Sequence, residues 1–165
     1  YEDTGFNNRR SQEANVGARA RLRLLERLKS RGVPVSGFGD TAQIIIDQWN
    51  SGRWFYNEIQ DLGMDLHLTE FQTRFLYDNE RSLDIAPAEW REKSSRTYAD
   101  YIGFFKSFRR AKTITFWTPF DTWNSLRAGG GTFSHASQPN ARVGLFDENY
   151  LPNQNYNAVM LALSR

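Results

Sequence analysis

Apolar and polar positions follow two different periods along the chain, which predicts helices separated by short strands. Apolar residues recur every three or four positions, as on the buried face of a helix, over about 13–31, 51–62, 88–110 and 153–163. Shorter β-branched and aromatic runs predict strands over 33–39, 65–71 and 113–118, with the end of another strand within 1–8. Gly32 and Gly63 are placed to end the first two helices, and Pro87 suits the first turn of the third.

The order of these elements indicates the fold class. Helices that alternate with short buried strands form parallel βαβ units. Long connections follow the strands, over 71–88 and 120–142, whereas short glycine-stopped turns precede them, which is typical of a (β/α)8 barrel. A full barrel needs eight strands and roughly 250 residues, but this chain of 165 residues has about four strands. We therefore predict one α/β domain over residues 1–165, either the C-terminal half of a barrel or a smaller open sheet.

Composition narrows the function classes. The chain is 39% hydrophobic and 24% charged, as expected of a folded globular domain, and its 15% aromatic content supplies rings that can serve as platforms for sugars. The net charge is only +2, and the arginines of the first helix are interpreted as a solvated face, which argues against nucleic acid as a partner. There is no cysteine, no apolar run near the ~18 residues of a membrane span, and no signal peptide or initial Met. We interpret the chain as a mature or cleaved piece.

Glu70 is the main candidate for chemistry, because it stands at the end of the predicted 65–71 strand. Ionised carboxylates resist burial, so a glutamate at this place is a poor choice for stability and a good one for catalysis. The alternative interpretation is a structural one, in which Glu70 forms an ion pair with Arg74 at the strand end. His67 has the opposite strand parity from Glu70, and we expect it to be a hydrogen-bonded structural residue. The two histidines of the chain lack nearby carboxylates at ligand spacing, so no metal site is predicted.

Several segments, in the right order along the chain, together resemble motifs of glycoside hydrolase family 10, the xylanase family of retaining (β/α)8 enzymes. Residues 66–70 (LHLTE) resemble its I-T-E-L strand, and residues 31–39 (RGVPVSGFG) its sixth strand, G-V-P-I-D-G-I-G. Residues 114–117 (ITFW), with Asp121 and Trp123, resemble its eighth-strand T-x-W-G…D…W segment. Residues 144–152 (GLFDENYLP) resemble its closing L-L-F-D-x-x-Y-x-P, and the chain start resembles Y-N-D-Y on strand five. The resemblance implies strands five to eight of the barrel, with the first four absent.

The resemblance also implies roles for individual residues. Glu70 takes the place of the nucleophile and Trp117 that of the tryptophan under the cleaved sugar, and the further substrate-binding candidates are Trp123, Gln43, Asp3 and Asp121. Each has a structural alternative: Trp117 as a core aromatic, Trp123 as loop packing and Asp121 as a turn cap. The sequence departs from the family pattern at three places, where it has Gln43 for the histidine that orients the nucleophile, Thr118 for a glycine and Glu2 for an asparagine.

The family's second catalytic carboxylate, the acid/base, lies on strand four, and nothing in this chain matches that strand. The carboxylates of the chain that we considered for the role are Glu2, Asp3, Asp40 and Asp121, but we expect the acid/base to come from outside the chain.

The expected function is therefore that of a retaining endo-β-glycanase, xylanase-like, which hydrolyses β-1,4-linked polysaccharide by a two-carboxylate double displacement without a cofactor. The expected partners are the polysaccharide and the N-terminal half of the barrel, with no membrane contact, and the resemblance implies secretion. One alternative is a non-catalytic carbohydrate-binding or structural half-barrel, and another is an unrelated α/β binding domain.

Overall fold

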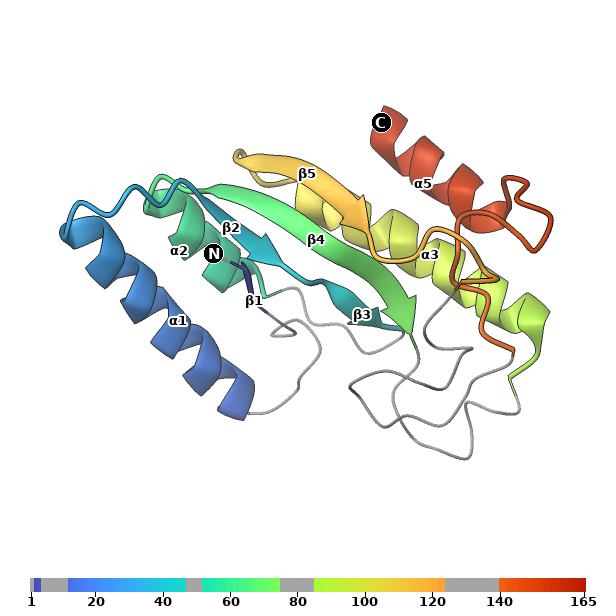
Figure 1. Cartoon of the computed structure of the whole chain (residues 1–165), viewed down its shortest axis with the longest axis horizontal. Coiled ribbons are helices and arrows are strands. Elements are labelled where there is room, and N and C mark those ends of the chain that lie inside the picture. The colour runs from blue at the N-terminus through green and yellow to red at the C-terminus, as the bar shows by residue number, and fades with distance from the viewer. Residues whose placement is uncertain (1, 4–11, 47–51, 75–84, 124–139) are drawn as a thin grey trace.

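The computed structural model describes residues 2–3, 12–46, 52–74, 85–123 and 140–165, and within these ranges a parallel sheet is covered by helices (Figure 1). The elements in chain order are β1 (Glu2–Asp3), α1 (Gln12–Ser30), β2 (Gly37–Asp40), β3 (Gln43–Ile45), α2 (Arg53–Asp61), β4 (Asp65–Arg74), α3 (Pro87–Lys106), β5 (Ala111–Phe116) and α5 (Gln154–Ser164). None of the described helices is both long and apolar enough to cross a membrane.

The strands are all parallel and neighbour one another in chain order. β1 pairs with β2, β2 and β3 both pair with β4, and β4 pairs with β5. β2 lies beside residues 65–68 of β4 and β3 beside residues 72–74, so the two short strands form one interrupted strand along the same edge. The interruption falls at Ala42, whose φ of 32° lies in the left-handed region. This order of parallel neighbours confirms the predicted βαβ units, which fit both a half barrel and a smaller open sheet.

A single apolar core fixes which face of the sheet the helices cover. Leu66, Leu68 and Phe71 of β4 are fully buried in one cluster with residues of α1, α2, α3 and α5. The cluster is strongly aromatic: the ring of Phe71 meets Tyr98 edge-on at 5.0 Å and Tyr101 at 5.5 Å. The helices therefore cover one face of the sheet, and the side chains between these positions on β4 point to the opposite face, which we call the open face.

Most element boundaries agree with the sequence prediction. Gly32 and Gly63 end the helices before them with φ values of 73° and 75°, as expected, and Pro87 is the first residue of α3. For the helix cap before α2 we considered Asp47 or Ser51, which lie outside the described residues. The N-cap of α2 is Gly52, with no side-chain hydrogen bond.

Several predicted boundaries were wrong. α3 ends at Lys106 and not at about 110, and β5 spans Ala111–Phe116 where 113–118 was predicted. The strand expected over 33–39 forms only from Gly37, and β4 continues to Arg74 where a loop was expected from Phe71. The extension was missed because Phe71 is followed by three polar residues, which show no alternation of apolar and polar positions. Thr73 is nevertheless fully buried on the helix side, where its Oγ1 lies 2.6 Å from Ser94 Oγ of α3.

Candidate active site

Glu70 lies on a β-bulge in the central strand. From Leu68 to Gln72, β4 advances four residues while the paired edge of β2 and β3 advances three. From Leu68 to Phe71, β4 advances three residues while β5 advances two. Both neighbours thus require one extra residue in β4 at Thr69–Glu70. Bulges are frequent beside active sites, where they redirect a side chain.

The bulge places Glu70 on the open face. Leu68 and Phe71 both point into the helix-side core, although an odd number of steps separates them. The extra residue absorbs that mismatch, so that Thr69 and Glu70 both point away from the core, and both are partly exposed. Glu70 is therefore carried by a strand that is paired on both sides. The sequence had predicted Glu70 at the end of its strand, but β4 continues to Arg74.

The bulge also corrects the prediction for His67. In a regular strand His67 and Glu70 would face opposite sides, but the extra residue puts both on the open face. The His67 ring lies next to Gly37 of β2: a Cβ added at Gly37 would lie 3.0 Å from His67 Nε2. His67 Nδ1 lies 2.8 Å from Thr113 Oγ1 of β5. The expectation of a hydrogen-bonded histidine is confirmed, whereas the parity argument behind it was wrong.

The structure brings Gln43 and Trp117 to the same end of the open face. Gln43 is the Cα partner of Gln72 on β4, and paired residues of parallel strands share a face. Trp117 follows β5, donates its backbone N–H to Phe71 O at 3.2 Å, and is 46% exposed. This exposure contradicts the alternative of Trp117 as an ordinary core aromatic.

Trp123 lies in a second exposed aromatic group, farther along the chain from β5. Its side chain is 72% exposed, and its Nε1 donates to the hydroxyl of Tyr150 at 3.5 Å. The ring of Tyr150 in turn packs edge-on against Phe120 at 5.5 Å. An exposed tryptophan held by one polar contact presents a flat apolar ring to solvent.

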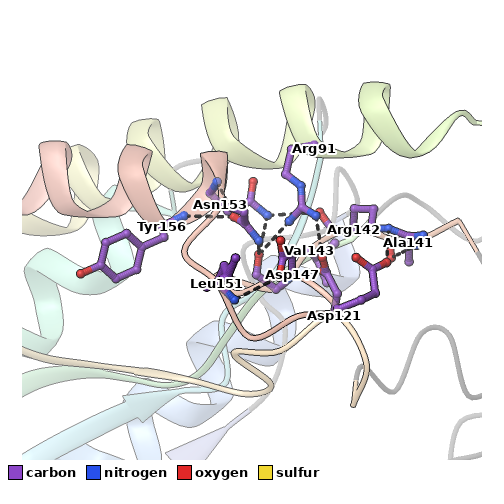
Figure 2. A network of polar contacts seen from close by, with 12 residues as sticks. Arg91, Asp121, Ala141, Arg142, Val143, Asp147, Leu151, Asn153 and Tyr156 are labelled. Atoms are coloured by element: carbon purple, nitrogen blue, oxygen red, sulfur yellow. Dashed lines mark hydrogen bonds and ion pairs between the residues drawn. The ribbon is translucent and has the colours of Figure 1, made fainter.

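Asp121 does not belong to this surface. It is fully buried, and its Oδ2 forms an ion pair with Arg91 Nη2 of α3 at 2.5 Å (Figure 2). Its Oδ1 accepts a hydrogen bond from the backbone N–H of Gly144 at 2.9 Å. Burial raises the pKa of the Asp121 carboxyl, and the hydrogen bond and charge of Arg91 oppose that shift. With both oxygens engaged and no surface exposed, Asp121 is a structural residue, and its prediction as a substrate contact was wrong.

The carbonyl of Gly144 completes this buried network (Figure 2). It accepts hydrogen bonds from Arg91 Nη1 at 3.2 Å, from Asn153 Nδ2 at 3.0 Å and from Asn155 Nδ2 at 2.8 Å. Asn153 also caps α5, because its Oδ1 accepts from the backbone N–H groups of Asn155 and Tyr156. The network thus fixes the last helix to α3 and to the segment after β5.

Asp3 is on β1, where its Cα partner is Asp40 of β2. β2 separates this strand from β4, and the side chain of Asp3 lies outside the described part. Asp40 points the other way from the open face: it is fully buried and accepts a 2.6 Å hydrogen bond from Tyr56 of α2. Among the described residues, no group of three His, Asp or Glu side chains is arranged to hold a metal ion.

Gln72 is the residue of the open face that the sequence analysis missed. It is 1% exposed, and its Oε1 accepts a 2.8 Å hydrogen bond from Thr118. It was overlooked because the strand was expected to end before it. Its spacing of two from Glu70 would have been the signal, since such residues share a strand face.

Xylanases are among the solved structures that superpose on this chain, and the chain covers about half of the two described here. Native xylanase 10B from Thermotoga maritima superposes with a TM-score of 0.72 and 23% identity, over 99% of this chain and 46% of its own. A thermostable mutant of a xylanase from Cellvibrio japonicus gives a TM-score of 0.74 and 21% identity, over 100% of this chain and 49% of its own.

Sequence comparison gives the same assignment. A β-1,4-xylanase of Dictyoglomus thermophilum is 25% identical over 126 residues, which are 72% of this chain and 36% of that protein. The sequence model of glycosyl hydrolase family 10 matches residues 5–162, nearly the whole chain. The chain therefore belongs to glycosyl hydrolase family 10, of whose (β/α)8 barrel it spans about the C-terminal half.

Proposed function

We propose that this chain supplies the nucleophile, Glu70, of a retaining glycosidase that hydrolyses β-1,4-linked xylan. The observation that carries the proposal is the bulge at Thr69–Glu70, which places a partly exposed carboxylate on the open face of the central strand. A strand paired on both sides holds that carboxylate rigidly, as attack on a sugar carbon requires. The exposed ring of Trp117, on the same face, is suited to lie under the sugar.

The reaction has two displacements. In the first, a Glu70 oxygen attacks the anomeric carbon, the bond to the leaving oxygen breaks, and a second carboxyl group protonates that oxygen. In the second, water attacks the same carbon, gives its proton to the second carboxylate and releases Glu70. Each displacement inverts the carbon, so the product keeps the β configuration. The two carboxyl groups must lie about 5–5.5 Å apart.

We further propose that the second carboxylate comes from outside this chain, from the N-terminal half of the barrel. Of the carboxylates considered for the role, Asp40 is buried against Tyr56, and Asp121 is buried against Arg91. The N-terminal half would also cover α5, on which Met160, Leu161 and Leu163 are 43–52% exposed. We also propose that the protein acts outside the cell, where polymeric xylan is found, and assay of the culture supernatant tests that placement.

Covalent labelling tests the nucleophile. A 2-deoxy-2-fluoro-β-xylobioside with a dinitrophenolate leaving group needs no acid catalyst, because dinitrophenolate departs without a proton. We expect one fluoroxylobiosyl group, as an ester on Glu70, in peptide mass spectra of the barrel assembled with its N-terminal half. The Glu70→Gln variant should not be labelled, whereas a control, Glu92→Gln at an exposed carboxylate of α3, should be labelled like the wild type. A label on another residue would refute the assignment.

A second candidate function is carbohydrate binding without catalysis, which the burial of Asp40 and Asp121 favours if no other segment supplies an acid. Comparing this chain alone with the chain joined to its N-terminal half separates the two. Catalysis predicts xylan hydrolysis only by the joined protein. Xylan binding by the joined protein, with neither hydrolysis nor labelling, would favour the second candidate.

A further inference from the structure

Trp117 carries an exposed ring that its own side-chain contacts do not fix. The indole is 46% exposed, and within the described part of the chain it makes no hydrogen bond and no ring contact. A ring without such contacts takes its direction from the backbone that carries it. The position of this ring is therefore set by how the chain is held on either side of Trp117.

The chain before the ring is tied to β4, the neighbouring strand (Figure 1). Phe116, the last residue of β5, is the Cα partner of Phe71, and Trp117 donates its backbone N–H to Phe71 O at 3.2 Å. The pairing of the two strands ends there, and the backbone bends at Trp117. A second tie, beyond the bend, is needed to fix the ring.

Thr118 supplies that tie. Its hydroxyl donates a 2.8 Å hydrogen bond to Oε1 of Gln72, the residue that follows Phe71 on β4. Gln72 is only 1% exposed, so water does not compete for this acceptor. The amide nitrogen of Gln72 has no partner among the described residues, so this bond is the only one that its side chain makes in that part of the chain. A buried amide with one unpaired end costs stability, so packing alone does not explain this glutamine.

We propose that Thr118 and Gln72 are positioning residues that hold the Trp117 ring in place for the sugar. The two ties of this segment reach consecutive residues of β4, Phe71 and Gln72, and they enclose the bend at Trp117. The proposal rests on Trp117 lying under the sugar, as in the proposed function. It also accounts for a departure from the family pattern: glycine, which Thr118 replaces, has no side chain to donate.

The segment beyond Thr118 is anchored independently of this bond. The Pro119 carbonyl accepts hydrogen bonds from the backbone N–H groups of Leu145 at 2.7 Å and Phe146 at 3.0 Å. Loss of the Thr118–Gln72 bond should therefore free the bend without detaching the segment. A ring that is free to turn must be ordered when a sugar binds, and that ordering lowers affinity.

The test is Thr118→Val, made in the Glu70→Gln variant of the barrel assembled with its N-terminal half and titrated calorimetrically with xylotetraose. Valine has the shape of threonine but no hydroxyl to donate. We expect Kd to rise by about 3–5-fold, less than the roughly tenfold rise expected of Trp117→Ala. Thr118→Ser keeps the hydroxyl and should bind like the Glu70→Gln variant. When Trp117→Ala is already present, Thr118→Val should change Kd no further, because the bond acts only through the ring.

Ser94→Ala is the matched control, because it removes a buried hydroxyl bond from the opposite face of β4. Ser94 Oγ lies 2.6 Å from Thr73 Oγ1, and Thr73 is the residue after Gln72. This variant should lower the free energy of unfolding and leave Kd unchanged. Gln72→Leu removes the bond from the β4 side and carries the test if Thr118→Val does not fold, with the same expected rise in Kd and the same dependence on the ring.

The outcomes separate this inference from the proposed function. If Trp117→Ala leaves Kd unchanged, the sugar platform of the proposed function is wrong and the positioning role fails with it, whereas labelling still tests Glu70 separately. If Trp117→Ala weakens binding but neither Thr118→Val nor Gln72→Leu does, the platform stands and the positioning role is overturned. Weak binding by Thr118→Ser, or an equal loss from Thr118→Val without the ring, would also overturn it, since the hydroxyl would then not act through Trp117.

Discussion

The Arg91–Asp121–Gly144 network and the second half of β4, which carries Glu70, both lie toward the C-terminal side of neighbouring strands, yet their polar groups differ in burial. In the network both Asp121 oxygens are bonded, the Gly144 carbonyl accepts from three side chains, and the carboxylate is fully buried. Around Glu70 the carboxylate is partly exposed and a buried Gln72 amide has no described partner. The first arrangement suits a structural joint, and the second suits a site whose remaining partners are a substrate and a reacting carboxylate.

The two regions also differ in how apolar surface is used. Around the network, Tyr98 is fully buried, and its hydroxyl donates to Val143 O at 2.9 Å. Burial raises the pKa of Tyr98, so it stays a neutral donor. At the open face, the large ring of Trp117 is exposed instead. Carboxylates and aromatics alone therefore do not distinguish a structural joint from a catalytic site, whereas the burial of the carboxylate and of the rings does.

Asp121→Ala should have the largest effect on stability, lowering the free energy of unfolding by about 3–5 kcal/mol, because it leaves the Arg91 guanidinium unpaired in the interior. Urea unfolding measures this. Asp61→Ala is the control: its ion pair with Arg109 is 2.7 Å long but exposed, so we expect a loss of at most about 1 kcal/mol. If Asp121→Ala unfolds like the wild type but loses xylan binding, Asp121 is a substrate contact after all.

Gly144→Ala should lower the free energy of unfolding by about 1–3 kcal/mol. A Cβ at this position would lie 2.5 Å from the backbone nitrogen of Asp121 and 2.7 Å from the carbonyl carbon of Phe120, so the network must shift. Gly103→Ala, in the last turn of α3 with open space around it, should instead stabilise by about 0.5–1 kcal/mol. Thermal and urea unfolding of the two variants should therefore move in opposite directions, and equal shifts would rule out the close approach.

Trp117→Ala should weaken xylo-oligosaccharide binding by about 1–2 kcal/mol, roughly tenfold in Kd, because a sugar face loses its apolar partner. Calorimetric titration of the Glu70→Gln background measures binding without turnover. Trp54→Ala provides the control, since this tryptophan of α2 is 37% exposed and lies under the guanidinium of Arg19, on the helix side. Equal binding by Glu70→Gln with and without Trp117→Ala would show that the ring does not contact the sugar.

Asn153→Ala should cost about 1 kcal/mol of unfolding free energy, because α5 loses its N-cap and Gly144 loses one donor. Asn157→Ala, at an exposed position of the same helix, should be neutral or slightly stabilising, since alanine is the better helix former. Urea unfolding of the pair separates the cap from a general effect of removing asparagine. A smaller loss for Asn153→Ala than for Asn157→Ala would contradict the capping role.

The sequence by itself determined the helices, the order of parallel strands and the strand that carries Glu70. These follow from local rules: the period of apolar positions, the glycines that end α1 and α2, and the proline that starts α3. The family assignment was also in the sequence, in motifs spread along the whole chain. Each of these signals depends on residues that are near one another in the chain.

Only the tertiary structure decided which face each site residue occupies. The bulge at Thr69–Glu70 is visible only in the pairing with β2, β3 and β5, and it reversed the expected side of His67 and extended the strand to include Gln72. The burial of Asp121 likewise depends on Arg91, 30 positions earlier in the chain. Register and burial are set by contacts between distant segments, and no local period in the sequence encodes them.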